Sequence, residues 1–210
     1  MAMQQCMAIC VIQENEMEQL QFYRVDMKYV RNLKNVERQQ TGRTNTILSV
    51  SSQTHKQGRP FVGIIRMING VKYCIPLSSI EEKTKYNSIS ENITCRKIKD
   101  ENGITIGILN INNMIPVRDE YISVFEIDDL PNDSMEQAAY KAKCRKELKW
   151  CNDNINEISR LSSELHRIVC SNEPFNKRNI CPNYLALEKE CAKAKEISKR
   201  NQKKKIRRKK

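Results

Sequence analysis

Two adjacent serines in the first half of the chain follow an apolar run and precede a polar stretch that contains lysines. Ser78 and Ser79 come directly after VKYCIPL, and Lys83 and Lys85 follow shortly afterwards. RNA cleavage needs little more than hydroxyls and cations. The substrate's own 2′-OH can be the nucleophile, so the protein must only position it, move protons and stabilise the phosphorane. With a tyrosine on a covering helix, this junction would form an RNA-cleaving site. Two serines after a strand are also a common start of a loop, and the pattern alone leaves that structural role open.

Other kinds of catalytic site have weaker signals in this sequence. The chain has two histidines, His55 and His166, and nothing in the sequence places them together. We interpret His166 as a structural or surface residue of a helix. The adjacent carboxylate pairs at 81–82 and 128–129 would point to opposite faces of a strand, which disfavours a two-metal nuclease. Because no P-loop, GxGxxG, GxSxG or HExxH motif occurs, we expect neither a metal nor another cofactor.

The charge of the chain favours a polyanionic partner. The formal net charge is +12, and residues 193–210 contribute most of it, with eleven Lys or Arg and one Glu. This tail, which includes Lys203 and Arg207, is either a phosphate-binding arm or a solvated helix end. Nucleic acid is the preferred partner over a membrane, because no apolar run approaches the length that spans a bilayer and the tail has few large apolar residues.

The cysteines indicate a reducing compartment. There are nine, an odd number, without a CxxC pair or zinc-ligand spacing. We therefore expect reduced thiols in a cytosolic protein. Residues 1–12 lack the basic start of a signal peptide, and we expect residues 1–19 to form an extension outside the fold.

The first half of the chain predicts strands around one helix. A strand is expected over 22–25, and Asp26 can cap a helix over 27–36. Residues 39–59 are polar and predict a long surface loop. Asn69-Gly70 between the apolar runs 60–67 and 71–77 is the strongest hairpin signal in the chain. Pro76 should end the second strand, which would place both serines just past the strand end.

The second half changes from strands to helices. Strands are expected over 93–98, 104–117 and 121–127, with a turn at 100–103. From 134 to 169 apolar residues recur every three or four positions, as in an amphipathic helix, and Pro174 ends this stripe. A last helix follows Pro182. Strands followed by helices indicate an α+β fold, with helices packed on an antiparallel sheet.

The order of these motifs resembles a known toxin family. RPFVGI at 59–64, NGVKYCIPLSS at 69–79, ILNI at 108–111 and MIPV at 114–117 occur in one chain, followed by Tyr140-Lys141. From about 21 to 195 this order is similar to the type III toxin–antitoxin endoribonucleases of the ToxN/AbiQ/CptN family. The resemblance implies a compact twisted antiparallel sheet with a barrel core like that of the MazF/Kid toxins.

The resemblance also implies an activity and its partners. It implies metal-independent RNA cleavage that leaves a 2′,3′-cyclic phosphate, and inhibition by a short pseudoknot RNA cut by the toxin from a tandem-repeat precursor. Toxin and RNA would alternate in closed assemblies, and the system would act in phage abortive infection. It implies a single toxin domain over 20–198, followed by the basic tail 199–210. The alternative is a non-catalytic RNA-binding protein that uses the same groove and tail.

Matching positions carry the family's functional residues onto this chain. Ser79 corresponds to the essential serine, Ser78 to the hydroxyl residue before it, Arg59 to a basic position and Tyr140 to a functional tyrosine. The chain departs from the family after the serines, where Ile80-Glu81 replaces the usual Pro-Lys. Either Lys83 reaches back into the site, which we favour, or the cation comes from elsewhere. The remaining expected RNA contacts are His55, Lys85, Lys141, Lys203 and Arg207.

Overall fold

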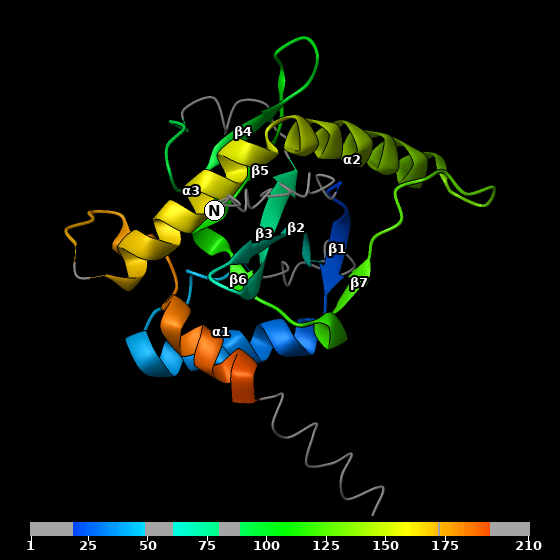
Figure 1. The fold of residues 1–210 in the computed structure, drawn as a ribbon. Coiled ribbons are helices and arrows are strands. Elements are labelled where there is room, and N and C mark those ends of the chain that lie inside the picture. Colours follow the sequence, from blue (N-terminus) through cyan, green and yellow to red (C-terminus); the bar gives the residue numbers. More distant parts are fainter. Residues whose placement is uncertain (1–18, 49–60, 80–88, 172, 194–210) are drawn as a thin grey trace, which may run out of the picture.

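The fold is built on one antiparallel sheet with helices on both faces. The computed structural model describes residues 19–48, 61–79, 89–171 and 173–193 (Figure 1). The strands are β1 (Phe22–Val25), β2 (Phe61–Ile68), β3 (Val71–Ser79), β4 (Arg96–Lys99), β5 (Thr105–Leu109), β6 (Ile115–Pro116) and β7 (Ile122–Val124). The helices are α1 (Met27–Thr41), α2 (Met135–Asp153), α3 (Ile155–Cys170) and a last helical segment, 184–193. Three short 3-10 turns join them: η2 (Ile111–Asn113), η3 (Asp119–Tyr121) and η4 (Arg178–Ile180). The predicted α+β class is confirmed.

The sheet is open rather than closed. Its strands follow the order β4-β5-β3-β2-β1-β7, and β6 adds to β3. Every pairing is antiparallel. Because β4 and β7 are the two edges of this path and do not pair with each other, the expected MazF/Kid-like barrel is not confirmed among the described strands.

The predicted hairpin is confirmed, but its second strand is longer than expected. Asn69 and Gly70 both have positive φ, 49° and 78°, as a two-residue turn between these strands requires. Pro76 does not end β3, and this prediction was wrong. Pro76 is the last β3 residue opposite β2, and residues 77–79 pair with β5 instead. Its missing N–H falls where the strand changes partner, and its carbonyl still accepts a hydrogen bond from Asn110 N at 2.9 Å.

Local signals also place the helix boundaries. Asp26 accepts hydrogen bonds from the first turn of α1, as predicted, and the helix ends at Gly42, whose φ is 74°. The helix therefore runs further than expected into the predicted loop, most of which lies outside the described residues. The long stripe after 134 is two helices, α2 and α3, which meet at Asn154. The backbone of Asn154 leaves the helical conformation, with φ −113° and ψ 18°, and its side chain donates to the Trp150 carbonyl at 2.8 Å.

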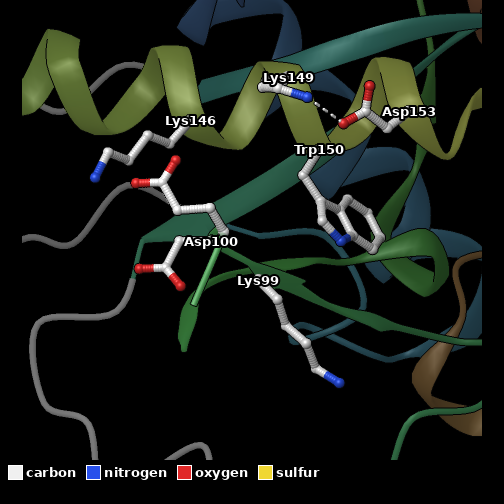
Figure 2. Close-up of a pocket in the computed structure, with 7 residues that line it drawn as sticks. Lys99, Asp100, Lys146, Lys149, Trp150 and Asp153 are labelled. Atoms are coloured by element: carbon white, nitrogen blue, oxygen red, sulfur yellow. Dashed lines mark hydrogen bonds and ion pairs between the residues drawn. The ribbon is translucent and has the colours of Figure 1, made fainter. Parts of the chain in front are cut away.

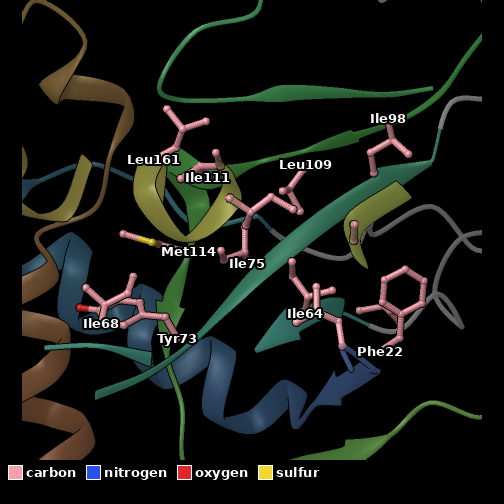
Figure 3. Packing of buried hydrophobic residues seen from close by; sticks show 14 of the residues in the cluster. Phe22, Ile64, Ile68, Tyr73, Ile75, Ile98, Leu109, Ile111, Met114 and Leu161 are labelled. Atoms are coloured by element: carbon pink, nitrogen blue, oxygen red, sulfur yellow. The ribbon is translucent and has the colours of Figure 1, made fainter. Parts of the chain in front are cut away.

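Two apolar layers enclose the sheet. Alternate residues of β3 face opposite layers, with Tyr73 and Ile75 on one side and Cys74 on the other. The first layer lies beneath α2 and α3 and includes Leu109 and Leu161 (Figure 3). The second lies beneath α1 and segment 184–193, which run side by side in Figure 1. Both faces of the sheet are therefore covered, and β3 is fixed in its centre.

The seven cysteines in the described part of the chain are all free thiols. None of the helices within the described ranges is both long enough and apolar enough to cross a membrane.

Candidate functional site

The two serines are the last residues of the central strand. Ser78 pairs with Ile108 of β5, and Ser79 pairs with Gly107. They therefore belong to the sheet and do not open a loop, which corrects the position expected for them. Strand pairing on a central strand holds their backbone on a rigid support, and this is the property that a positioned hydroxyl needs.

Ser78 has a defined hydrogen-bond partner. Asn110 follows β5, and its Nδ2 donates to Ser78 Oγ at 2.9 Å. The backbone N–H of Asn110 is in turn bonded to Pro76 O, so the amide is anchored to the same strand as the serine. Because this amide uses an acceptor site of the hydroxyl, the Ser78 proton remains available for a partner such as a phosphate oxygen. Asn110 was not among the predicted site residues, although its place directly after an apolar strand was visible in the sequence.

The sheet-facing side of α2 brings an acid to the neighbouring strand. Tyr140, Cys144, Glu147 and Cys151 recur at helical spacing and so share one face of α2. The side chain of Glu147 is buried, with 2% of the residue surface exposed. A Cβ added at Gly107 would lie 2.6 Å from Glu147 Oε1, so the carboxylate lies directly against this glycine. Gly107 is the ladder partner of Ser79, whose position the structure describes by its backbone alone. The charge of Glu147 within an apolar stripe was the signal that could have identified it.

Tyr140 lies on the same face, two turns earlier. It is 38% exposed, and its ring centroid is 6.0 Å from that of Phe125, which follows β7. The Arg24 guanidinium lies over the other ring of this pair, 4.4 Å from the Phe125 centroid. Seven residues of helix separate Tyr140 from Glu147, or about 10 Å. Tyr140, which is partly exposed, and the buried Glu147 therefore lie on the same face of α2, two turns apart.

Comparison with known proteins shows which family the chain belongs to. Residues 21–192 match the family model described as Toxin ToxN, type III toxin-antitoxin system. The chain belongs to the ToxN toxin family. It is 27% identical over 154 residues to Endoribonuclease ToxN of Pectobacterium atrosepticum, which covers 71% of this chain and 81% of that protein. It is 25% identical over 162 residues to Endoribonuclease ToxN of Bacillus thuringiensis subsp. kurstaki, covering 75% and 79%.

Solved structures share the fold of this ToxN-family chain. One comes from work on selective toxin inhibition by a non-coding RNA pseudoknot in bacterial type III systems, with a TM-score of 0.65 and 20% identity over 85% of this chain and 99% of the other. Another is AbiQ, a lactococcal anti-phage endoribonuclease of the type III toxin–antitoxin system, with a TM-score of 0.64 and 16% identity over the same shares, 85% and 99%. These likenesses establish the common fold.

In this ToxN-family chain, Lys141 has partners within the protein. It is only 8% exposed, and its Nζ donates to Asp133 Oδ2 at 2.7 Å and to the Asp128 carbonyl at 2.8 Å. The hydrogen bond from Lys141 holds the pKa of Asp133 below its usual value, and the Leu130 backbone N–H adds to this effect. Lys141 therefore ties the loop after β7 to α2, and a contact with RNA remains a prediction.

Six of the predicted ToxN site residues lie outside the described residues. They are His55, Arg59, Lys83, Lys85, Lys203 and Arg207. Which lysine supplies the cation near the serines therefore stays a prediction. Within the described ranges, no group of three or more His, Cys, Asp or Glu side chains could hold a metal ion.

A shallow hollow lies on the other side of α2, beside the turn after β4 (Figure 2). Its volume is about 170 Å³, and it is lined by Lys99, Asp100, Glu101, Lys146, Lys149, Trp150 and Asp153. Lys149 is paired with Asp153 at 2.7 Å. Since its three lysines face three carboxylates, the hollow has no net charge and does not select a polyanion by charge alone.

Proposed function

We propose that this ToxN-family protein is an endoribonuclease toxin that cleaves RNA without a metal cofactor. The observation that carries the proposal is the serine pair at the end of a central strand, within a family match that spans residues 21–192. The two relatives named Endoribonuclease ToxN, matched over 81% and 79% of their length, support the same activity. Cleavage leaves a 2′,3′-cyclic phosphate because the substrate's own 2′-OH is the nucleophile.

The reaction requires two proton movements and stabilisation of charge on phosphorus. The 2′ oxygen forms a bond to the adjacent phosphorus, the bond from phosphorus to O5′ breaks, the 2′-OH loses its proton and O5′ gains one. Ser78, whose oxygen already accepts from Asn110, can donate its proton to a non-bridging phosphate oxygen. We assign the essential hydroxyl to Ser79, proton transfer to Tyr140 and the stabilising cation to Lys83.

The partners of the proposed toxin are RNAs. A repeat-derived pseudoknot RNA inhibits the toxin and is processed by it, in a closed assembly of toxin and RNA, in the bacterial cytoplasm. The proposed biological role is phage abortive infection, and the likeness in fold to the anti-phage endoribonuclease AbiQ supports this role. One toxin domain covers 20–198, and the proposed RNA contacts are Arg59, His55, Lys85, Lys141, Lys203 and Arg207. A net charge of +12 makes such binding weaken as the salt concentration rises.

The direct test compares Ser79→Ala with the native protein in an RNA cleavage assay that contains EDTA. We expect the native protein to cut and the variant to lose activity by about 100-fold or more, since one positioned proton-transfer group is typically worth that much. Expression in cells should lose its toxicity in parallel. Ser123→Ala, an exposed serine on the edge strand β7, is the matched control and should cut normally.

Two results would contradict the proposal. Full activity of Ser79→Ala at equal protein level would remove the catalytic assignment, and a cut that depends on added metal would contradict the mechanism. RNA binding by the native protein without any cut would favour the non-catalytic RNA-binding alternative.

A further inference from the structure

The buried carboxylate of Glu147 has no place in the chemistry described so far. Burying a charged carboxylate is unfavourable unless other groups compensate it, and an apolar side chain would fill this position at a lower cost. Glu147 is 2% exposed, between Cys144 and Cys151 on a helix face that packs on the sheet. The sheet residues next to Glu147 indicate why a carboxylate occupies this position.

The sheet register shows what lies beside it. Ser79, Gly107 and Ile98 occupy one row across β3, β5 and β4. Glu147 Oε1 lies so close to Gly107 that an added Cβ would be 2.6 Å away, and Glu147 Cδ would be 3.3 Å away. Since neighbouring strands are about 4.8 Å apart, the carboxylate reaches the sheet one strand away from the ladder position of Ser79. Only a glycine at 107 leaves room for this approach.

The two thiols on the same helix face do not act as proton acceptors. Burial, with the charge of Glu147 as the second cause, raises the pKa of Cys144 to about 12. The same two causes raise the pKa of Cys151. Both thiols therefore stay protonated at neutral pH. Among the described residues on this face from Tyr140 to Cys151, Glu147 is the one that can accept a proton there.

We propose that Glu147 is a positioning residue for RNA cleavage. Glu147 acts through Ser79, and the lack of a side chain at Gly107 lets the Glu147 carboxylate lie against the sheet. In the step it serves, the 2′-OH proton passes to the Ser79 hydroxyl as that hydroxyl passes its own proton to Glu147. The 2′ oxygen then bonds to phosphorus, the bond to O5′ breaks, and O5′ takes a proton from Tyr140, which regains one from solvent. Glu147 afterwards returns its proton to solvent. This inference rests on the proposed endoribonuclease function.

The experiment measures cleavage rate, RNA affinity, pH profile and thermal unfolding of purified full-length variants. Glu147→Gln keeps the shape but removes the charge, and we expect kcat to fall about 100-fold with KM unchanged. The acidic limb of the pH profile should disappear, because no carboxylate remains to ionise. Gly107→Ala should cause a comparable loss by displacing the carboxylate. Glu136→Gln, an exposed acid on the same helix, is the control and should behave like the native protein.

Glu147→Asp extends the test to a variant that keeps the charge. It should retain an acidic limb but cleave about 10-fold more slowly, because a displacement near 1 Å is costly for a positioned group. A folded Glu147→Gln protein with native rate and pH profile would overturn the inference. If that variant does not fold, native rates from Glu147→Asp and Gly107→Ala together would overturn it. The proposed function fails separately, through an active Ser79→Ala protein or an absence of cleavage by the native protein.

Discussion

At the scale of single residues, the site depends on how one hydroxyl is held. Ser78 is oriented by Asn110, whose amide is anchored to β3 and lies at the end of β5. A serine without this partner could rotate freely and would lose the defined direction of its proton.

Asn110→Ala should therefore lower the cleavage rate, with only a small decrease in the free energy of unfolding. We expect about a 10-fold lower rate from the loss of orientation, and about 1 kcal/mol less stability from the loss of a partly buried hydrogen bond. Single-turnover cleavage and urea unfolding measure the two effects. Asn112→Ala, which removes an exposed side-chain bond to the Ile180 carbonyl, is the control. A normal rate in Asn110→Ala would show that Ser78 needs no such support.

At the scale of elements, α2 is the part that assembles the site. It crosses the sheet from Phe125 beside β7, near Tyr140, to β5, where Glu147 meets Gly107. Its first turns are held by the loop at 128–133, through the ion pair between Lys141 and Asp133. That contact sets the position of Tyr140, the residue just before Lys141.

This ion pair predicts a pH effect with a definite sign. The folded pKa of Asp133 lies below the ordinary 3.8, so the contribution is complete above that pH and is lost as the pH falls through the lower folded value. Lys141→Met should return the Asp133 pKa toward 3.8, which NMR titration measures. Lys146→Met, at an exposed lysine of α2, should leave it unchanged. An unaltered Asp133 titration in Lys141→Met would contradict the contact.

At the scale of the whole molecule, a polar cluster in the core joins the C-terminal segment to both the sheet and α3. Glu188 Oε1 accepts from the Tyr73 hydroxyl at 2.6 Å and lies 2.9 Å from His166 Nε2. Tyr73 and His166 are both buried, and the ring of Tyr184 stacks on the imidazole. This burial fits the interpretation of His166 as a structural residue.

Glu188→Ala should therefore destabilise the whole fold. It leaves the hydroxyl of Tyr73 and the imidazole of His166 without their shared acceptor, at a cost of about 1–3 kcal/mol. Urea unfolding measures this difference. Glu190→Ala, on the same segment, removes only surface contacts to Asn32 and Lys193 and should cost less than about 1 kcal/mol. Equal effects of the two substitutions would argue against a joining role for the cluster.

The sequence by itself determined the features that depend on neighbouring residues. Asn69-Gly70 specified the hairpin because both positions adopt positive φ, and Asp26 specified the start of α1 because its carboxylate binds the first turn. The change from strands to helices along the chain was enough for the α+β class. The motif order around Ser78 and Ser79 was enough for the family.

Only the tertiary structure decided the features that depend on distant partners. It decided that β3 changes from β2 to β5 at Pro76, so that both serines are strand residues, and that the strand path stays open. It also decided that Lys141 faces a carboxylate and that Glu147 lies against Gly107. The physical reason is that turn and cap preferences are written in adjacent residues. Strand partners and the burial of a charge are set by which elements pack together across the whole chain.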